Sequence, residues 1–165
     1  MKSPYLFAAI SAFAFAAGGC SNNQPASAGN ADFTAQLTGG EQVPAVTTTA
    51  SGTASFSLNS DGTELHYKLT VAGLSDVTMA HLHLGAMAGN GPPVAWLYPS
   101  APPPKQIDGP SNGVLSEGSI TAADLKGPLA GKTIGDLVAA IKAHNIYVNV
   151  HTKEHGDGEI RGQVQ

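Results

Sequence analysis

The chain has a single cysteine among its 165 residues, so no disulfide can form within one copy of it. Only 12% of the residues are charged, and the formal net charge is −4 at neutral pH. Without a basic excess, the composition argues against binding to nucleic acid. No Ser-His-Asp arrangement and no close pair of carboxylates suggests a hydrolase. Against this sparsely charged background, the six histidines are the most conspicuous polar residues.

The start of the chain has the features of a secretory signal. Lys2 gives a positive start, residues 5–17 are apolar, and small residues follow. This apolar run is too short to span a bilayer. The sequence Ala17-Gly18-Gly19-Cys20 resembles a bacterial lipobox, with Ala17 where leucine is usual. The resemblance implies cleavage before Cys20 and lipidation of that cysteine; the alternative is ordinary signal-peptidase cleavage that leaves a free thiol.

These features divide the chain into three parts. We expect a signal peptide over residues 1–19, a lipidated Cys20 with a flexible polar tether over residues 20–31, and one folded domain over residues 32–165. Because Ser21, and not an aspartate, follows the cysteine, the lipoprotein resemblance implies the outer membrane, facing the periplasm or the cell surface. The membrane is then a partner through the lipid anchor alone.

Short alternating segments bounded by turn residues predict an antiparallel β-protein. Residues 65–71 and 79–85 read as two neighbouring strands of a meander, separated by a turn over residues 72–78. Residues 85–113 are rich in glycine and proline and read as a long ordered loop, interrupted by a short strand over residues 94–98. A further short strand is expected over residues 114–120.

One helix is expected near residues 134–143. Ile134, Leu137, Val138 and Ile141 recur at helical spacing, and Thr133 precedes them as an N-cap. The predicted fold class is therefore mainly β: a single antiparallel Greek-key β-sandwich with one short helix.

Two segments about seventy residues apart carry a metal-binding pattern. In residues 79–85, alternation puts Leu82 and Leu84 on the core face and His81 and His83 on the opposite, polar face. In residues 146–152, the valines face the core and His151 takes the polar face. Histidines two positions apart in a strand are roughly 6.5–7 Å apart along one face, so both can lean onto one ion.

We expect His81, His83 and His151 to bind one transition metal, with His66 or His155 as a fourth ligand. Asn149, Glu159 and Arg161 are candidates for side chains that hold these histidine ligands in place. Three or four imidazoles without a thiolate suit copper, and zinc is possible. The alternative is a solvated polar sheet surface that binds no metal.

The same segments resemble a known family. Residues 80–85 (Ala-His-Leu-His-Leu-Gly), 89–94 (Gly-Asn-Gly-Pro-Pro-Val), 147–152 (Tyr-Val-Asn-Val-His-Thr) and 158–163 (Gly-Glu-Ile-Arg-Gly-Gln) are similar to the CHRD domain, named for its repeats in chordin. The resemblance covers residues 32–165. It implies little about activity, since the domain belongs to a growth-factor antagonist in chordin and has a poorly defined role in bacteria.

A weaker resemblance connects His81, His83 and His151 with the copper ligands of copper/zinc superoxide dismutase. The chain lacks that family's disulfide pair and its zinc-site residues. Three functions stay open: a copper-binding envelope lipoprotein, a metal-free module that binds protein or glycan, and a dismutase-like copper enzyme.

Overall fold

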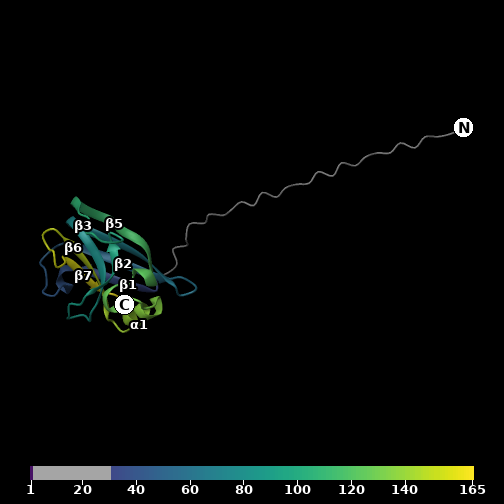
Figure 1. Ribbon diagram of the computed structural model, residues 1–165. Coiled ribbons are helices and arrows are strands. Elements are labelled where there is room, and N and C mark those ends of the chain that lie inside the picture. The colour runs from purple at the N-terminus through teal and green to yellow at the C-terminus, as the bar shows by residue number, and fades with distance from the viewer. Residues whose placement is uncertain (2–30) are drawn as a thin grey trace.

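The computed structural model describes Met1 and residues 31–165 (Figure 1). The predicted signal peptide, Cys20 and most of the tether lie outside the described residues. The described chain forms a seven-stranded sheet and an α-helix. The strands are β1 (Phe33–Thr38), β2 (Ser51–Leu58), β3 (Glu64–Leu84), β4 (Pro93–Tyr98), β5 (Ile107–Thr121), β6 (Ile146–Thr152) and β7 (Ile160–Gln163), and the helix is α1 (Ile134–Lys142). Short 3-10 turns occur at Gly39–Glu41, Ala122–Asp124 and Gly127–Leu129.

All strand pairs are antiparallel, and the sheet closes on itself. The strand order is β2-β1-β7-β6-β3-β4, and a further pairing between β2 and β3 completes a barrel-like ring. β5 pairs with β3 outside this ring. The expected mainly antiparallel β-fold is therefore confirmed. The expected Greek-key sandwich is wrong, because one closed sheet takes the place of two packed sheets.

The length of β3 explains this difference. Its 21 residues pair with β2 and β5 in the first part and with β6 and β4 in the second. Gly73 and Asp76 adopt positive φ angles of 72° and 52° at register shifts, so the strand is bent but not reversed. The turn predicted over residues 72–78 is thus wrong, and the two expected neighbouring strands are one strand. The loop predicted over residues 85–113 is also shorter than expected, because β5 already begins at Ile107.

The core follows the predicted alternation. Leu82, Val148 and Val150 are fully buried, whereas Leu84, at the end of β3, is only partly buried. The helix α1 lies at one end of the sheet (Figure 1) and buries Leu137 and Ile141 in the same core. Its predicted N-cap is confirmed, since the Thr133 hydroxyl accepts from the backbone N–H of Asp136. Within the described residues, no helix is long and apolar enough to cross a membrane.

Candidate metal centre

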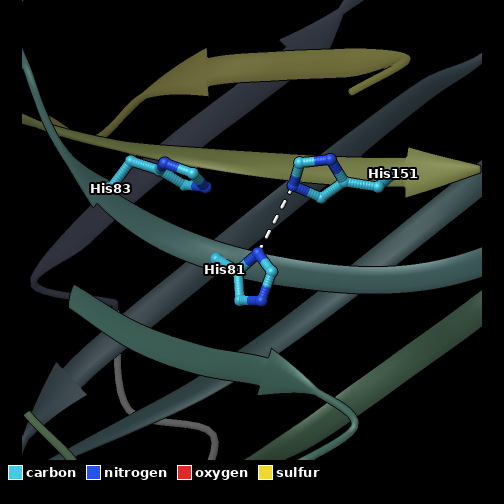
Figure 2. Close-up of side chains that lie close together, drawn as sticks. All are labelled: His81, His83 and His151. Carbon is cyan, nitrogen blue, oxygen red and sulfur yellow. Dashed lines mark hydrogen bonds between the residues drawn. The ribbon is translucent and has the colours of Figure 1, made fainter. Parts of the chain in front are cut away.

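Pairing of β3 with β6 brings the three predicted ligands together. The register places His83 opposite Tyr147, His81 opposite Asn149, and Met79 opposite His151. Because alternate residues share a face, His81, His83 and His151 all project from the same side of the sheet. One possible ligand atom from each lies within 4.8 Å of the other two. Figure 2 shows the rings of His83 and His151 pointing toward each other, and a dashed line joins a nitrogen of His81 to His151.

This face of the sheet is covered. His81, His83 and His151 are only 4%, 8% and 5% exposed, although they lie on the side opposite the apolar core. The alternative of a solvated polar sheet surface is therefore wrong, and the predicted alternation is right. Backbone around Gly91 and Gly156 reaches over the histidines and takes part in their hydrogen bonds.

Those hydrogen bonds fix how two of the rings are protonated. His83 Nδ1 lies 2.8 Å from the Gly91 carbonyl oxygen, and His151 Nδ1 lies 2.9 Å from the Gly156 carbonyl oxygen. A carbonyl oxygen can only accept, so both Nδ1 atoms carry the proton and donate. Both Nε2 atoms then carry a lone pair; that of His83 has no hydrogen-bond partner, and that of His151 faces His81 Nδ1. This arrangement orients imidazoles in metal sites, where the second ring nitrogen donates to a carbonyl or carboxylate.

The third ring completes a convergent set of nitrogens. His81 Nδ1 lies 3.3 Å from His151 Nε2. Two nitrogens that each bind one ion at about 2.0–2.1 Å are separated by roughly 3.3–3.6 Å at tetrahedral to trigonal angles. The His81–His151 pair already has this separation. His83 Nε2 is buried and has no hydrogen-bond partner, which is rare for a buried polar atom and leaves its lone pair available to a metal ion.

Burial also keeps the imidazoles uncharged. Desolvation, with smaller contributions from His151 and the neighbouring His83, lowers the pKa of His81 to about 3. Desolvation lowers the pKa of His83 to about 4, against an opposing effect of its bond to Gly91. Desolvation also lowers the pKa of His151. All three rings are therefore neutral at neutral pH and offer lone pairs for which protons compete weakly.

Aromatic side chains surround the three rings. Trp96, from β4, lies edge-on to His81 with ring centroids 4.2 Å apart. Tyr147 stacks on His83 at 4.9 Å with an interplanar angle of 16°. The guanidinium carbon of Arg161 lies 3.5 Å from the centre of the Tyr147 ring. The histidines are thus held in a packed aromatic layer and cannot rotate freely.

A family profile for the CHRD domain matches residues 33–164, which is the span from β1 to the end of the described sheet. The chain belongs to the CHRD domain family. No curated protein and no solved structure matches it in the other two comparisons.

Two further histidines of this CHRD domain do not join the cluster. His66 is exposed near the start of β3, fifteen positions before His81 on the same strand, and its Nδ1 is hydrogen-bonded to Ser119 Oγ at 2.7 Å. His155 is half-buried and lines a surface groove of about 220 Å³ with Gln42 and Gly156. Neither belongs to the group of convergent ligand atoms. His66 was expected on a strand beside that of His81. Both residues instead lie in β3, so His66 is displaced along the strand from His81 and cannot lie next to it.

The three residues predicted to support the histidine ligands differ in their contacts. Arg161 reaches the cluster through Tyr147, as described. Asn149 lies between the histidines and a buried polar network: its Oδ1 accepts from Gln42 Nε2 at 2.6 Å, and its Nδ2 donates to the Asp157 carbonyl. Glu159 accepts from the hydroxyls of Thr48 and Thr152, and it is not part of the cluster.

Several groups that contact the three histidines were not predicted from the sequence. The Gly91 and Gly156 carbonyls carry no side-chain signal, so only the fold shows that they orient histidines. Trp96 lies in the short strand predicted over residues 94–98, but its contact with His81 depends on the pairing of β4 with β3, which the sequence did not predict. Alternation does place Tyr147 on the polar face of β6 with His151, but its stacking on His83 follows only from the pairing of β6 with β3.

Proposed function

We propose that this protein is an envelope-anchored lipoprotein whose CHRD domain binds copper through His81, His83 and His151. The observation that carries the proposal is the convergence of three buried, neutral imidazoles, with possible ligand atoms within 4.8 Å of one another. A histidine layer that served packing alone would cost stability, because it leaves a buried nitrogen of His83 without a hydrogen-bond partner.

The donor set supports copper as the ion. Mg²⁺ and Ca²⁺ require oxygen ligands, and no Asp or Glu joins the cluster among the described residues. Imidazole nitrogen suits copper and zinc, and copper binds more tightly at a given nitrogen site. Zinc with these three histidines would take water as its fourth ligand, since neither His66 nor His155 joins them.

A copper titration of the tag-free protein tests the proposal. Trp96 is the only tryptophan of the chain and lies against His81, so bound Cu(II) should quench its fluorescence. We expect quenching to saturate at one ion per chain. His81→Ala and His151→Ala should each abolish tight binding and leave the fold intact, whereas His66→Ala, outside the cluster, should bind as the parent does.

If the His81→Ala/His151→Ala double variant binds copper as tightly as the parent in calorimetry, the site does not exist. If the parent binds neither copper nor zinc, the metal-free module for protein or glycan becomes the better explanation.

The membrane anchor is tested separately. We expect mass spectrometry of the protein from bacterial membranes to find Cys20 as an acylated N-terminus, and Cys20→Ser to release the protein from the membrane fraction. An unmodified Cys20, or cleavage at another position, contradicts the anchor and leaves the copper proposal unaffected.

A further inference from the structure

The donor set of the metal centre carries no negative charge. Imidazoles bind metals in their neutral form, and no carboxylate or cysteine joins the three histidines among the described residues. A dication bound here keeps both of its charges in a layer that is almost closed to water. The cost of burying an ion without a counter-charge rises steeply with its charge. The site therefore disfavours divalent ions relative to monovalent ones.

Arg161 adds a fixed positive charge beside this centre. It is 1% exposed, and the sole ion pair among the described residues joins Lys68 and Glu117, so no carboxylate within salt-bridge distance neutralises it. The strand order β7-β6-β3 puts Tyr147 between Arg161 and His83. The repulsion between the guanidinium and a bound ion is proportional to the charge of that ion, so Arg161 penalises a dication twice as strongly as a monocation.

Arg161 is held in this place by the loop that covers His83. Its Nη1 donates to Asn90 Oδ1 at 3.2 Å, and its Nη2 donates to the carbonyls of Ala86 and Gly89, both at 3.0 Å. The same loop supplies the Gly91 carbonyl that accepts from His83. Arg161 cannot move away from the centre without losing these bonds, so its charge acts on every ion that binds.

The strand register places Met79, whose side chain carries a thioether sulfur, at the edge of the centre. It lies two positions before His81 on the same strand and directly opposite His151 in the β3–β6 register. Side chains directly opposite each other in an antiparallel pair have Cβ atoms about 4.5–5.5 Å apart. Thioether sulfur selects Cu(I) among the ions that imidazole also binds.

We propose that the three-histidine centre selects Cu(I) over Cu(II) and Zn(II), with Arg161 as the positioning residue that disfavours a dication and Met79 as an additional soft donor. This inference rests on the proposed copper site and names the form of the ion that the site takes. The ligand is therefore reduced copper, as expected for a protein that stores or passes on Cu(I), and the protein itself need not change the oxidation state.

The first test compares three ions on the full protein. Cu(I) affinity is measured anaerobically with ascorbate against a chromogenic Cu(I) chelator, and Cu(II) and Zn(II) affinities are measured against chelators of known strength at the same pH. We expect the dissociation constant for Cu(I) to be at least a hundredfold below those for the two dications. Equal or tighter binding of Cu(II) or Zn(II) overturns the inference.

The second test uses variants with matched controls. Arg161→Gln removes the positive charge. It should lower the ratio of the Cu(II) dissociation constant to the Cu(I) dissociation constant at least tenfold, which equals about 59 mV in the one-electron reduction potential. Arg161→Lys keeps the charge and should preserve the ratio even if both affinities fall. A purely structural role for Arg161 would move both affinities together and leave the ratio unchanged.

Met79→Leu keeps volume and apolar character, and it should weaken Cu(I) binding about tenfold with a smaller effect on Cu(II). Met87→Leu is the control, because Met87 is 63% exposed. Equal effects of the two substitutions contradict the role of Met79. Melting curves establish whether each variant folds. If Arg161→Gln does not fold, the comparison of the three ions on the parent protein decides the inference.

The outcomes separate this inference from the proposed function. Binding of no ion by the parent rejects the copper site itself. Tight binding of Cu(II) or Zn(II) that depends on His81 and His151, without a preference for Cu(I), retains the site and rejects the selectivity.

Discussion

Replacing Gly91 by alanine should disturb the proposed metal centre without changing any of its histidines. A Cβ at position 91 would overlap the backbone carbonyl of Leu84. Backbone cannot rotate out of the way as a side chain can, so the loop itself has to move. Gly91 is also the point at which the loop contacts the centre: its carbonyl accepts from His83 Nδ1, and its N–H donates to the Tyr147 hydroxyl at 3.1 Å.

The structure sets the size of the effect. Displacement of the loop leaves the buried His83 Nδ1–H without an acceptor, which costs about 1–3 kcal/mol of the free energy of unfolding. Loss of the partner that orients a metal-binding imidazole typically weakens metal affinity by about 10–100-fold. We therefore expect Gly91→Ala to lose stability and copper affinity together.

Gly89→Ala is the matched control in the same loop. The nearest atom to a Cβ at position 89, the Ala86 carbonyl oxygen, is 3.9 Å away, which is ordinary contact. Urea unfolding gives the stability of both variants, and quenching of Trp96 fluorescence gives their copper affinities. If Gly91→Ala matches Gly89→Ala in both measurements, the loop does not orient His83 in the way described.

Three further results are expected. Burial holds the pKa of His81 to about 3 and of His83 to about 4, below the value of about 6.5 in an unfolded chain, so the unfolded state takes up protons first as the pH falls. The metal-free protein should have its full stability above about pH 6.5 and lose it toward about pH 4; a urea midpoint that is constant across this interval contradicts the burial of neutral imidazoles. Thr133→Ala removes the cap of α1 and should cost about 1 kcal/mol of unfolding free energy while copper affinity stays unchanged; a loss of affinity in calorimetry would show that the helix supports the site. Gly158→Ala, whose Cβ would overlap the Asn149 side-chain amide at a φ of 119°, should lower the melting temperature, whereas Gly156→Ala, with open space around its Cβ, should not; equal melting temperatures would reject the crowding at Gly158.

Local patterns in the sequence predicted local structure correctly. Alternation placed Leu82, Val148 and Val150 in the core and the three histidines on the other face, because strand geometry leaves no other choice. The helical spacing and Thr133 located α1, since capping depends on a few neighbouring residues.

The long-range features could not be read in the same way. Gly73 and Asp76 have the composition of a turn, yet in β3 they make a bend, and only pairing with strands far along the chain decides between the two. That error placed His66 beside the site. The burial of the histidines depends on loops whose backbone carbonyls and close approach have no sequence signature.

The distance along the chain between His81 and His151 has a consequence for folding. The two rings are seventy residues apart in sequence and meet only when β6 has paired with β3. An ion held by both histidines therefore binds the folded chain in preference to the unfolded one. It stabilises the folded state by mass action, by a free energy that grows with the logarithm of its affinity. The protein has one cysteine and cannot form an internal disulfide. A bound ion would cross-link β3 to β6 through His81 and His151. Unlike a disulfide, this link is reversed when a chelator removes the ion or when the supply of copper falls.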